Sequence, residues 1–219
     1  AEDTPLSAAR LVEMFLEAGL PPASLCLVHG YGEDAGAPLV RHPDVALVSF
    51  AGSPEVGREV AITCAAEEKR LCLDLGERTA AVVLDDADLD LAADGVVRAG
   101  FAFSGQRWRG AAQLFVQRKA VKDFSERVIA RAEALRLGDG MSDTTDLGPI
   151  INETQLKRTH GHTRLGLRDG ARLLCGGEVV KEGECKRGFF YAPTVFGDAS
   201  LKMRLVQEDA RGPLAVLLP

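Results

Sequence analysis

The sequence predicts an α/β fold in which helices cover the faces of a largely parallel sheet. Along residues 1–75, short apolar runs alternate with amphipathic stretches, which is the order expected of successive strand–helix units. The runs are apolar at nearly every position, as expected of parallel strands that are buried on both faces. Glycine and proline residues separate the runs and mark the turns between them.

The first element is a helix with a clear start and end. Thr4 can cap it, Pro5 suits the first helical position, and Gly19 can end it. Apolar residues follow the spacing of an amphipathic helix at Ala8, Leu11, Val12 and Phe15. The elements expected next are a buried strand at 25–28, a short helix at 33–41, a strand at 45–50, a helix at 55–66 and a strand at 71–75. Together these elements look like half of a doubly wound nucleotide-binding domain.

A second series of elements begins after Gly76, which interrupts the pattern. A strand at 80–84 ends in an acidic run at 85–88, whose carboxylates suit the start of a helix reaching about residue 103. We therefore interpret the run as a helix cap rather than a calcium site. The later elements expected are a strand at 113–117, a helix at 121–135, a loop at 138–145, a helix at 153–169, a strand at 171–175, a hairpin-like stretch at 176–188, an extended stretch at 189–196 and a strand at 214–218.

Composition excludes several classes of protein. Hydrophobic residues make up 46% and charged residues 26% of the 219 residues, which is typical of a soluble globular chain of one large domain or parts of two. The net charge of −6 and the scattered basic residues argue against a nucleic-acid partner. There is no apolar run of about 20 residues, so we expect no membrane span. The N-terminal residues do not resemble a signal peptide.

The cysteines indicate a reducing compartment. The chain has five, widely spaced and without a Cys-x-x-Cys pair, so neither a disulfide framework nor a zinc site is predicted. We expect reduced thiols in a cytoplasmic protein. His160 and His162 lack a third ligand nearby in the sequence, so we interpret them as a surface pair rather than a metal site.

Seven short motifs occur in one order along nearly the whole chain. They are residues 48–58 with their glycine-serine pair, Leu73-Asp-Leu-Gly76, residues 85–90, Ser104-Gly-Gln106, Leu147-Gly-Pro149, residues 190–194 and Gly212-Pro213. In this order they resemble the aldehyde dehydrogenase superfamily. The resemblance implies a partial doubly wound Rossmann-like cofactor domain followed by part of the α/β catalytic domain.

The resemblance also implies where the domains begin and end and which reaction the family catalyses. It makes residues 1–75 the C-terminal half of the NAD-binding domain and residues 76–219 a partial catalytic domain. The family oxidises an aldehyde to a carboxylic acid with NAD or NADP. Members are much longer than this chain, so we expect it to begin partway through the cofactor domain and to end inside the catalytic domain.

The position of the family's catalytic cysteine holds Trp108. The family motif Gly-Gln-x-Cys supplies a thiolate that attacks the aldehyde carbon, and sulfur suits this role because it is strongly nucleophilic. Here the indole of Trp108 follows Gly105 and Gln106 at that spacing. An indole cannot replace the thiolate, so we expect Trp108 to act as a plug or core filler and the chain to be catalytically inactive.

The general-base position is also altered. The resemblance aligns the family's glutamate with Asp74, whose side chain is one methylene shorter and must still come within hydrogen-bond reach of the proton. The next two family positions, glycine and lysine, hold Glu77 and Arg78. We therefore expect Asp74 to be a solvated or capping carboxylate rather than a working base.

The cofactor-binding positions are better preserved. Gly52 and Ser53 lie at a strand-to-helix turn, where free amides and the helix dipole favour a pyrophosphate. By resemblance, Glu2 matches the acid that follows the family's adenosine-ribose lysine, and Asp209 replaces the glutamate that holds the nicotinamide ribose. Arg211 replaces the phenylalanine that lines the nicotinamide site. The resemblance implies NAD or NADP as the cofactor. We expect this chain to keep the inherited scaffold without binding the cofactor, and residual dinucleotide binding is the alternative.

Three functions stay open at this point. The chain is an aldehyde dehydrogenase relative without catalysis, a pseudoenzyme that serves as a binding or structural subunit, or a fragment of an active NAD(P)-dependent enzyme. The second function predicts a homo-oligomer or a partner subunit. In the parent family the small-molecule partner is an aldehyde.

Overall fold

The computed structural model describes residues 2–76, 79–107, 110–208 and 211–219. The chain forms two compact units, residues 1–76 and 77–219, which we name the N-terminal unit and the C-terminal unit. In the described part of the chain, no helix is both long enough and apolar enough to span a membrane.

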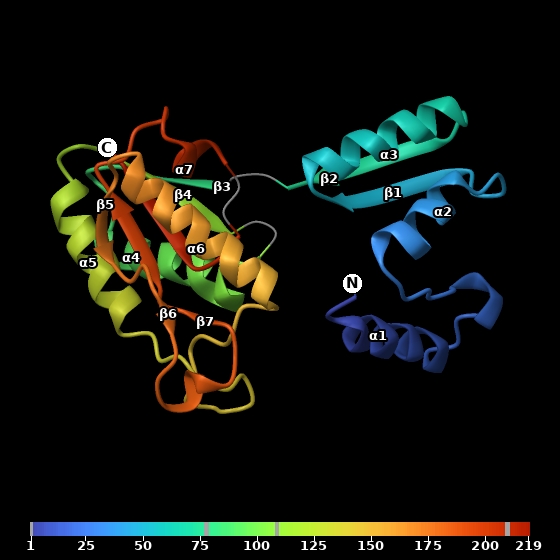
Figure 1. Cartoon of the computed structure of the whole chain (residues 1–219), viewed down its shortest axis with the longest axis horizontal. Coiled ribbons are helices and arrows are strands. Elements are labelled where there is room, and N and C mark those ends of the chain that lie inside the picture. Colours follow the sequence, from blue (N-terminus) through green and yellow to red (C-terminus); the bar gives the residue numbers. More distant parts are fainter. Residues whose placement is uncertain (1, 77–78, 108–109, 209–210) are drawn as a thin grey trace. The chain divides into compact units, whose positions relative to one another are not determined.

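The N-terminal unit contains a two-stranded parallel sheet (Figure 1). Strand β1, Leu47–Gly52, pairs with β2, Arg70–Leu75, and helix α3, Pro54–Ala66, connects them. Parallel strands need such a crossover, and this strand–helix–strand unit is the one that the sequence predicts. A small core of Val48, Val60 and Cys64 joins the sheet to α3.

The other elements of this unit are short. Helix α1, Pro5–Glu17, has Pro5 at its first position as predicted, although Thr4 makes no side-chain capping bond. It is followed by the 3-10 turn η1, Pro22–Ser24, the π-helical turn η2, Gly32–Gly36, and the helix α2, Ala37–Arg41.

The strand predicted at 25–28 is wrong. The segment belongs to no strand, and Leu27 and Val28 are 39% and 60% exposed. An apolar run becomes a strand only where another strand offers hydrogen bonds, and no described segment pairs with this one. The paired strands β1 and β2 are also less buried than their apolar sequences predict, with Leu47 54% exposed.

The C-terminal unit is built on a five-stranded sheet of order β3-β4-β9-β8-β5. All neighbours are parallel except the antiparallel pair β5–β8. The strands are β3, Thr79–Val83, β4, Ala111–Val116, β5, Arg172–Cys175, β8, Thr194–Gly197, and β9, Leu214–Leu218. Strand β9 lies in the middle of the sheet and is buried at all its positions, which explains its uninterrupted apolar sequence.

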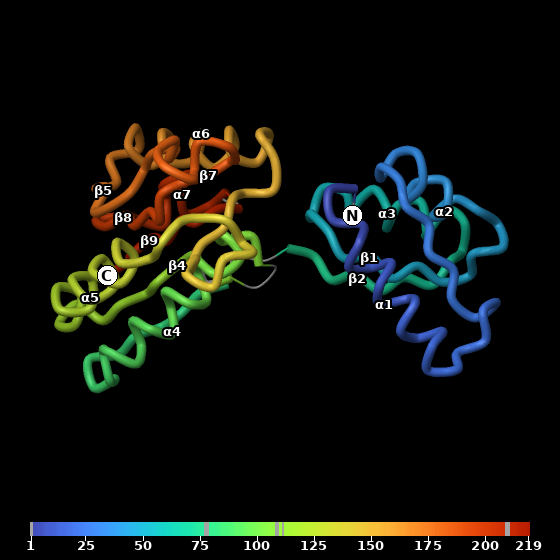
Figure 2. The backbone as a smooth tube through the Cα atoms, turned by 90° about the horizontal axis from the view of Figure 1, so that it is seen from below, coloured from blue at the N-terminus to red at the C-terminus, as the bar shows by residue number. Residues whose placement is uncertain are grey.

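Helices cover both faces of this sheet (Figure 2). Helices α4, Leu89–Phe101, and α5, Val121–Glu133, pack on one face around Phe101 and Phe124. Helix α6, Glu153–Arg168, covers the other face, where Leu156 and Phe196 share a core. The remaining elements are the turns η3, Ala102–Gly105, and η4, Gly183–Lys186, the hairpin of β6, Val179–Val180, and β7, Phe190–Tyr191, and the short helix α7, Arg204–Gln207.

The acidic run before α4 caps that helix, as predicted. Asp88 is the N-cap residue, and its carboxylate accepts the backbone N–H groups of Asp90 and Leu91, each at 3.1 Å. The carboxylate therefore satisfies two amides that have no partner inside the helix.

Candidate functional site

The turn between β1 and α3 carries Gly52 and Ser53. A side chain at Gly52 would meet the ring of Phe50, which packs over this glycine and would have to move aside. Ser53 caps α3: its Oγ accepts the N–H of Val56 at 3.3 Å, and Pro54 takes the first helical position. A serine hydroxyl can accept one hydrogen bond and donate another. Ser53 therefore keeps a donor for an anion at the start of the helix.

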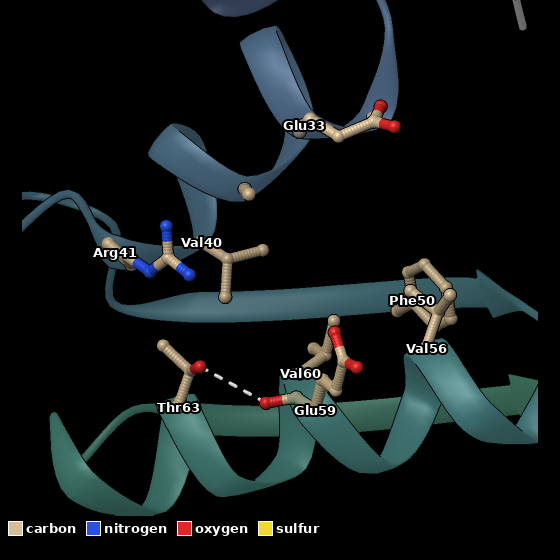
Figure 3. Close-up of a pocket in the computed structure, with 11 residues that line it drawn as sticks. Glu33, Val40, Arg41, Phe50, Val56, Glu59, Val60 and Thr63 are labelled. Carbon is tan, nitrogen blue, oxygen red and sulfur yellow. Dashed lines mark hydrogen bonds between the residues drawn. The ribbon is translucent and has the colours of Figure 1, made fainter.

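A slot runs along α3, beginning at Val56 on the first turn of that helix (Figure 3). It has a volume of about 440 Å³ and lies between α3 on one side and η2 and α2 on the other. Phe50 of β1 contributes an aromatic ring, and Val56 and Val60 present apolar surface from successive turns of α3. The full lining is Gly32, Glu33, Gly36, Ala37, Val40, Arg41, Phe50, Val56, Glu59, Val60 and Thr63.

Lys69 holds the two walls of the slot together. Its Nζ donates to the backbone carbonyls of Val40 at 2.7 Å and His42 at 2.6 Å. These carbonyls end α2, where the helix dipole favours a cation. Lys69 lies three residues beyond the end of α3, so the contact joins the end of α2 to the segment that follows α3.

Charged side chains line the slot as well. Glu33 reaches it from η2, Arg41 from α2 and Glu59 from α3 (Figure 3). The hydroxyl of Thr63 is already engaged, because it donates to the carbonyl of Glu59 at 3.0 Å. The slot therefore combines apolar walls with two carboxylates and one guanidinium.

Asp74 lies one strand away from the Gly52–Ser53 turn. It is an exposed residue of β2 in register with Ala51 of β1, and the N–H of Gly76 donates to the carbonyl of Gly52 at 2.9 Å. The end of β2 and the turn are therefore neighbours. Glu2 is exposed in the turn before α1.

In the C-terminal unit, the segment that leads to Trp108 has an unusual backbone. Phe103 and Ser104 both have left-handed conformations, with φ of 55° and 58°. Non-glycine residues adopt this conformation at a cost, and the surrounding contacts hold it here. The hydroxyl of Ser104 donates to the carbonyl of Gly148 at 2.6 Å, and the N–H of Ile151 donates to the side-chain oxygen of Gln106 at 3.1 Å.

The segment around Gly212 packs against the same turn and against α6. A side chain on Gly105, whose φ is +68°, would overlap the carbonyl oxygen of Gly212. The buried hydroxyl of Thr159 donates to the carbonyl of Arg211 at 2.9 Å. Three of the sequence motifs, at Gly105, Gly148 and Gly212, therefore meet in one place. Trp108, Glu77, Arg78 and Asp209 lie outside the described residues.

This close contact predicts that Gly105→Ala destabilises the C-terminal unit. The added methyl group meets backbone atoms that cannot move aside, and alanine disfavours the left-handed conformation, so we expect a loss of about 2 kcal/mol or more. Gly140→Ala is the matched control, because no atom lies near that position and its φ is outside the left-handed region. Urea unfolding measures both, and an equal change in the two variants would contradict the described packing.

The prediction that His160 and His162 form a surface pair is wrong for His162. His162 is 7% exposed, with its Nδ1 at 3.0 Å from the carbonyl of Arg158, and His160 Nδ1 lies 3.1 Å from the hydroxyl of Tyr191. Burial raises the pKa of Tyr191, so this hydroxyl stays protonated and donates to Thr163 at 2.8 Å. The buried face of α6 carries His162 and Thr163 together with Leu156, and this mixture of polar and apolar residues is not revealed by simple periodicity.

A family model described as the aldehyde dehydrogenase family matches residues 1–219. This chain belongs to the aldehyde dehydrogenase family. A phenylacetaldehyde dehydrogenase of Pseudomonas fluorescens is 39% identical over 220 residues, which cover 100% of this chain and 43% of the relative. The chain therefore spans less than half the length of that curated relative.

Solved structures of the family agree with the fold. The structure of HpcC from Thermus thermophilus has a TM-score of 0.93 at 41% identity, and the match covers 99% of this chain and 43% of that protein. A betaine aldehyde dehydrogenase from Staphylococcus aureus, solved in complex with NAD+, has a TM-score of 0.94 at 30% identity and is matched over 100% of this chain and 43% of its own. The partial Rossmann-like fold of this aldehyde dehydrogenase family member is thereby confirmed.

Sequence reasoning missed the slot in this family member. It singled out Gly52 and Ser53, which precede α3, but none of the residues that line the slot. A signal was present, because Val56, Val60 and Thr63 follow the i, i+4, i+7 spacing of one helix face. What the spacing could not show is that this face looks toward α2 across a gap.

Proposed function

We propose that this chain holds the adenosine and pyrophosphate end of NAD or NADP and does not oxidise aldehydes itself. The observation that supports nucleotide binding is the slot beside the capped first turn of α3. An apolar slot suits a flat base, and a helix start with a free hydroxyl donor suits a phosphate. The two features lie in the order in which a nucleotide presents these groups.

The family resemblance assigns the rest of the cofactor. Glu2 is the candidate for the adenosine ribose and Asp209 for the nicotinamide ribose. Arg211 stands where the family has an aromatic residue at the nicotinamide, and a cation is unfavourable beside an oxidised, positively charged ring. We therefore expect the adenosine half to contribute more binding free energy than the nicotinamide half.

The proposal that this chain does not oxidise aldehydes rests on Trp108. The family reaction begins with a thiolate at this position, and the indole of Trp108 supplies no equivalent nucleophile. Asp74 at the general-base position is a shortened carboxylate, which adds to the same expectation. Any bound cofactor would supply hydride acceptance, but this chain would not form the covalent adduct that precedes it.

The parent activity is the oxidation of an aldehyde to a carboxylic acid, and phenylacetaldehyde is the first aldehyde to assay because of the curated relative.

The observation that favours a second candidate function, a fragment of an active dehydrogenase, is that the chain spans 43% of that relative. A cytoplasmic location and an oligomeric assembly stay predictions.

The proposal predicts that ADP binds this chain and that nicotinamide mononucleotide does not. ADP carries the adenine and both phosphates that the slot and the start of α3 would hold, whereas nicotinamide mononucleotide lacks adenine and carries one phosphate. A ligand that binds only the folded state raises its melting temperature, so we expect ADP to raise the transition of the N-terminal unit and nicotinamide mononucleotide to leave it unchanged. The opposite result, or no shift with either, would contradict the proposal.

A further inference from the structure

The carboxylate of Glu59 is the least expected feature of the slot. Its neighbours on α3, Val56 and Val60, are apolar, and Phe50 supplies an aromatic ring from β1. Glu59 nevertheless extends from α3 on the side that faces α2 (Figure 3). Among the described residues no hydrogen bond or ion pair engages its carboxylate, although Arg41 lines the same slot.

Glu59 stands at a defined distance from the candidate phosphate position. It follows Ser53 by six residues, which corresponds to about 9 Å along a helix. This is the length over which a nucleoside extends from its 5′ phosphate to the far edge of its base. A nucleotide with its phosphate at Ser53 and its base between Val56 and α2 therefore presents that edge to the turn of Glu59.

We propose that Glu59 selects a 6-aminopurine over a 6-oxopurine in this slot, an inference that rests on the proposed nucleotide binding. An ionised carboxylate only accepts hydrogen bonds. The exocyclic amino group of adenine donates one, whereas the 6-oxo group of hypoxanthine is itself an acceptor and faces the carboxylate unfavourably. A slot with apolar residues alone would not distinguish the two bases in this way.

The slot contains a second carboxylate, Glu33, whose effect on nucleotide binding can be compared with that of Glu59. Glu33 lies on η2, on the other wall from α3 (Figure 3). The spacing along α3 puts Glu59, and not Glu33, level with the far edge of the proposed base. We therefore expect Glu33 to add negative charge to the slot without distinguishing the two bases. Glu67, which follows α3 as its C-cap residue and lies outside the slot lining, serves as the control for charge alone.

The test is calorimetric titration of the whole chain with ADP and with inosine diphosphate. We expect ADP to bind about tenfold more tightly, the value of one charge-assisted hydrogen bond in a partly exposed site. Glu59→Gln should bring the ratio toward one, because an amide both donates and accepts. Glu33→Gln and Glu67→Gln should keep the ratio of the unaltered chain.

The outcomes separate the two proposals. If ADP and inosine diphosphate bind the unaltered chain equally, or if Glu33→Gln rather than Glu59→Gln removes the preference, the role of Glu59 is overturned while nucleotide binding stands. If neither nucleotide binds, the proposed function itself is overturned, and the role of Glu59 with it.

Discussion

The purified chain should form no NADH above background when it is mixed with NAD and an aldehyde. If Trp108 takes the position of the thiolate, as the family resemblance implies, the covalent step of the family reaction has no nucleophile. Removal of the nucleophile from a well-studied serine protease lowers turnover by a factor on the order of 10⁶, and we expect a loss of that size relative to an active family member. The absorbance of reduced nicotinamide measures the product directly.

The positive control for this assay is the Pseudomonas fluorescens phenylacetaldehyde dehydrogenase under the same conditions. Aldehyde-dependent NADH formation by this chain would contradict the account most strongly if Asp74→Asn abolished it. Asparagine keeps the size of Asp74 and removes its basicity, so such a result would show a working base and a reaction that does not need the cysteine.

Val56→Arg should abolish nucleotide binding. Val56 lines the slot on the first turn of α3, three residues after Ser53, so the longer side chain would occupy the space proposed for the base. We expect affinity for ADP to fall by about a hundredfold, which corresponds to about 3 kcal/mol. The substitution should cost little stability because Val56 is 45% exposed.

Ile62→Arg is the matched control for this prediction. Ile62 lies on the same helix, is 67% exposed and does not line the slot, so the variant adds the same charge to α3 elsewhere. Equal affinities for ADP in the two variants would show that the slot is not the nucleotide site. Circular dichroism of both variants would establish that α3 remains folded.

Most elements of the fold could be predicted from the sequence because their signals are local. The helix at α3 has a capping serine and a proline at its start, and the apolar run of β9 reflects burial in the middle of a sheet. The run at 25–28 carries the same apolar signal but belongs to no strand. Whether such a run forms a strand depends on a partner distant in sequence, which no local pattern contains.

The candidate site could be predicted only in part, because many of its contacts join residues that are distant in sequence. Gly52 and Ser53 could be found because a strand-to-helix turn has a sequence signature. The contact of Thr159 with Arg211 joins positions separated by 52 residues, and His162 of α6 is buried although the sequence suggested a surface residue. Such contacts arise from the packing of α6 on the sheet, and no sequence motif predicts them.

The central claim is that this aldehyde dehydrogenase family member keeps the adenosine-binding slot of its N-terminal unit. Calorimetric titration of the unaltered chain with NAD tests it most directly. We predict a saturable heat that fits one site per chain and disappears when excess ADP fills the slot beforehand. The absence of a saturable heat, or a heat that ADP does not displace, would contradict the claim.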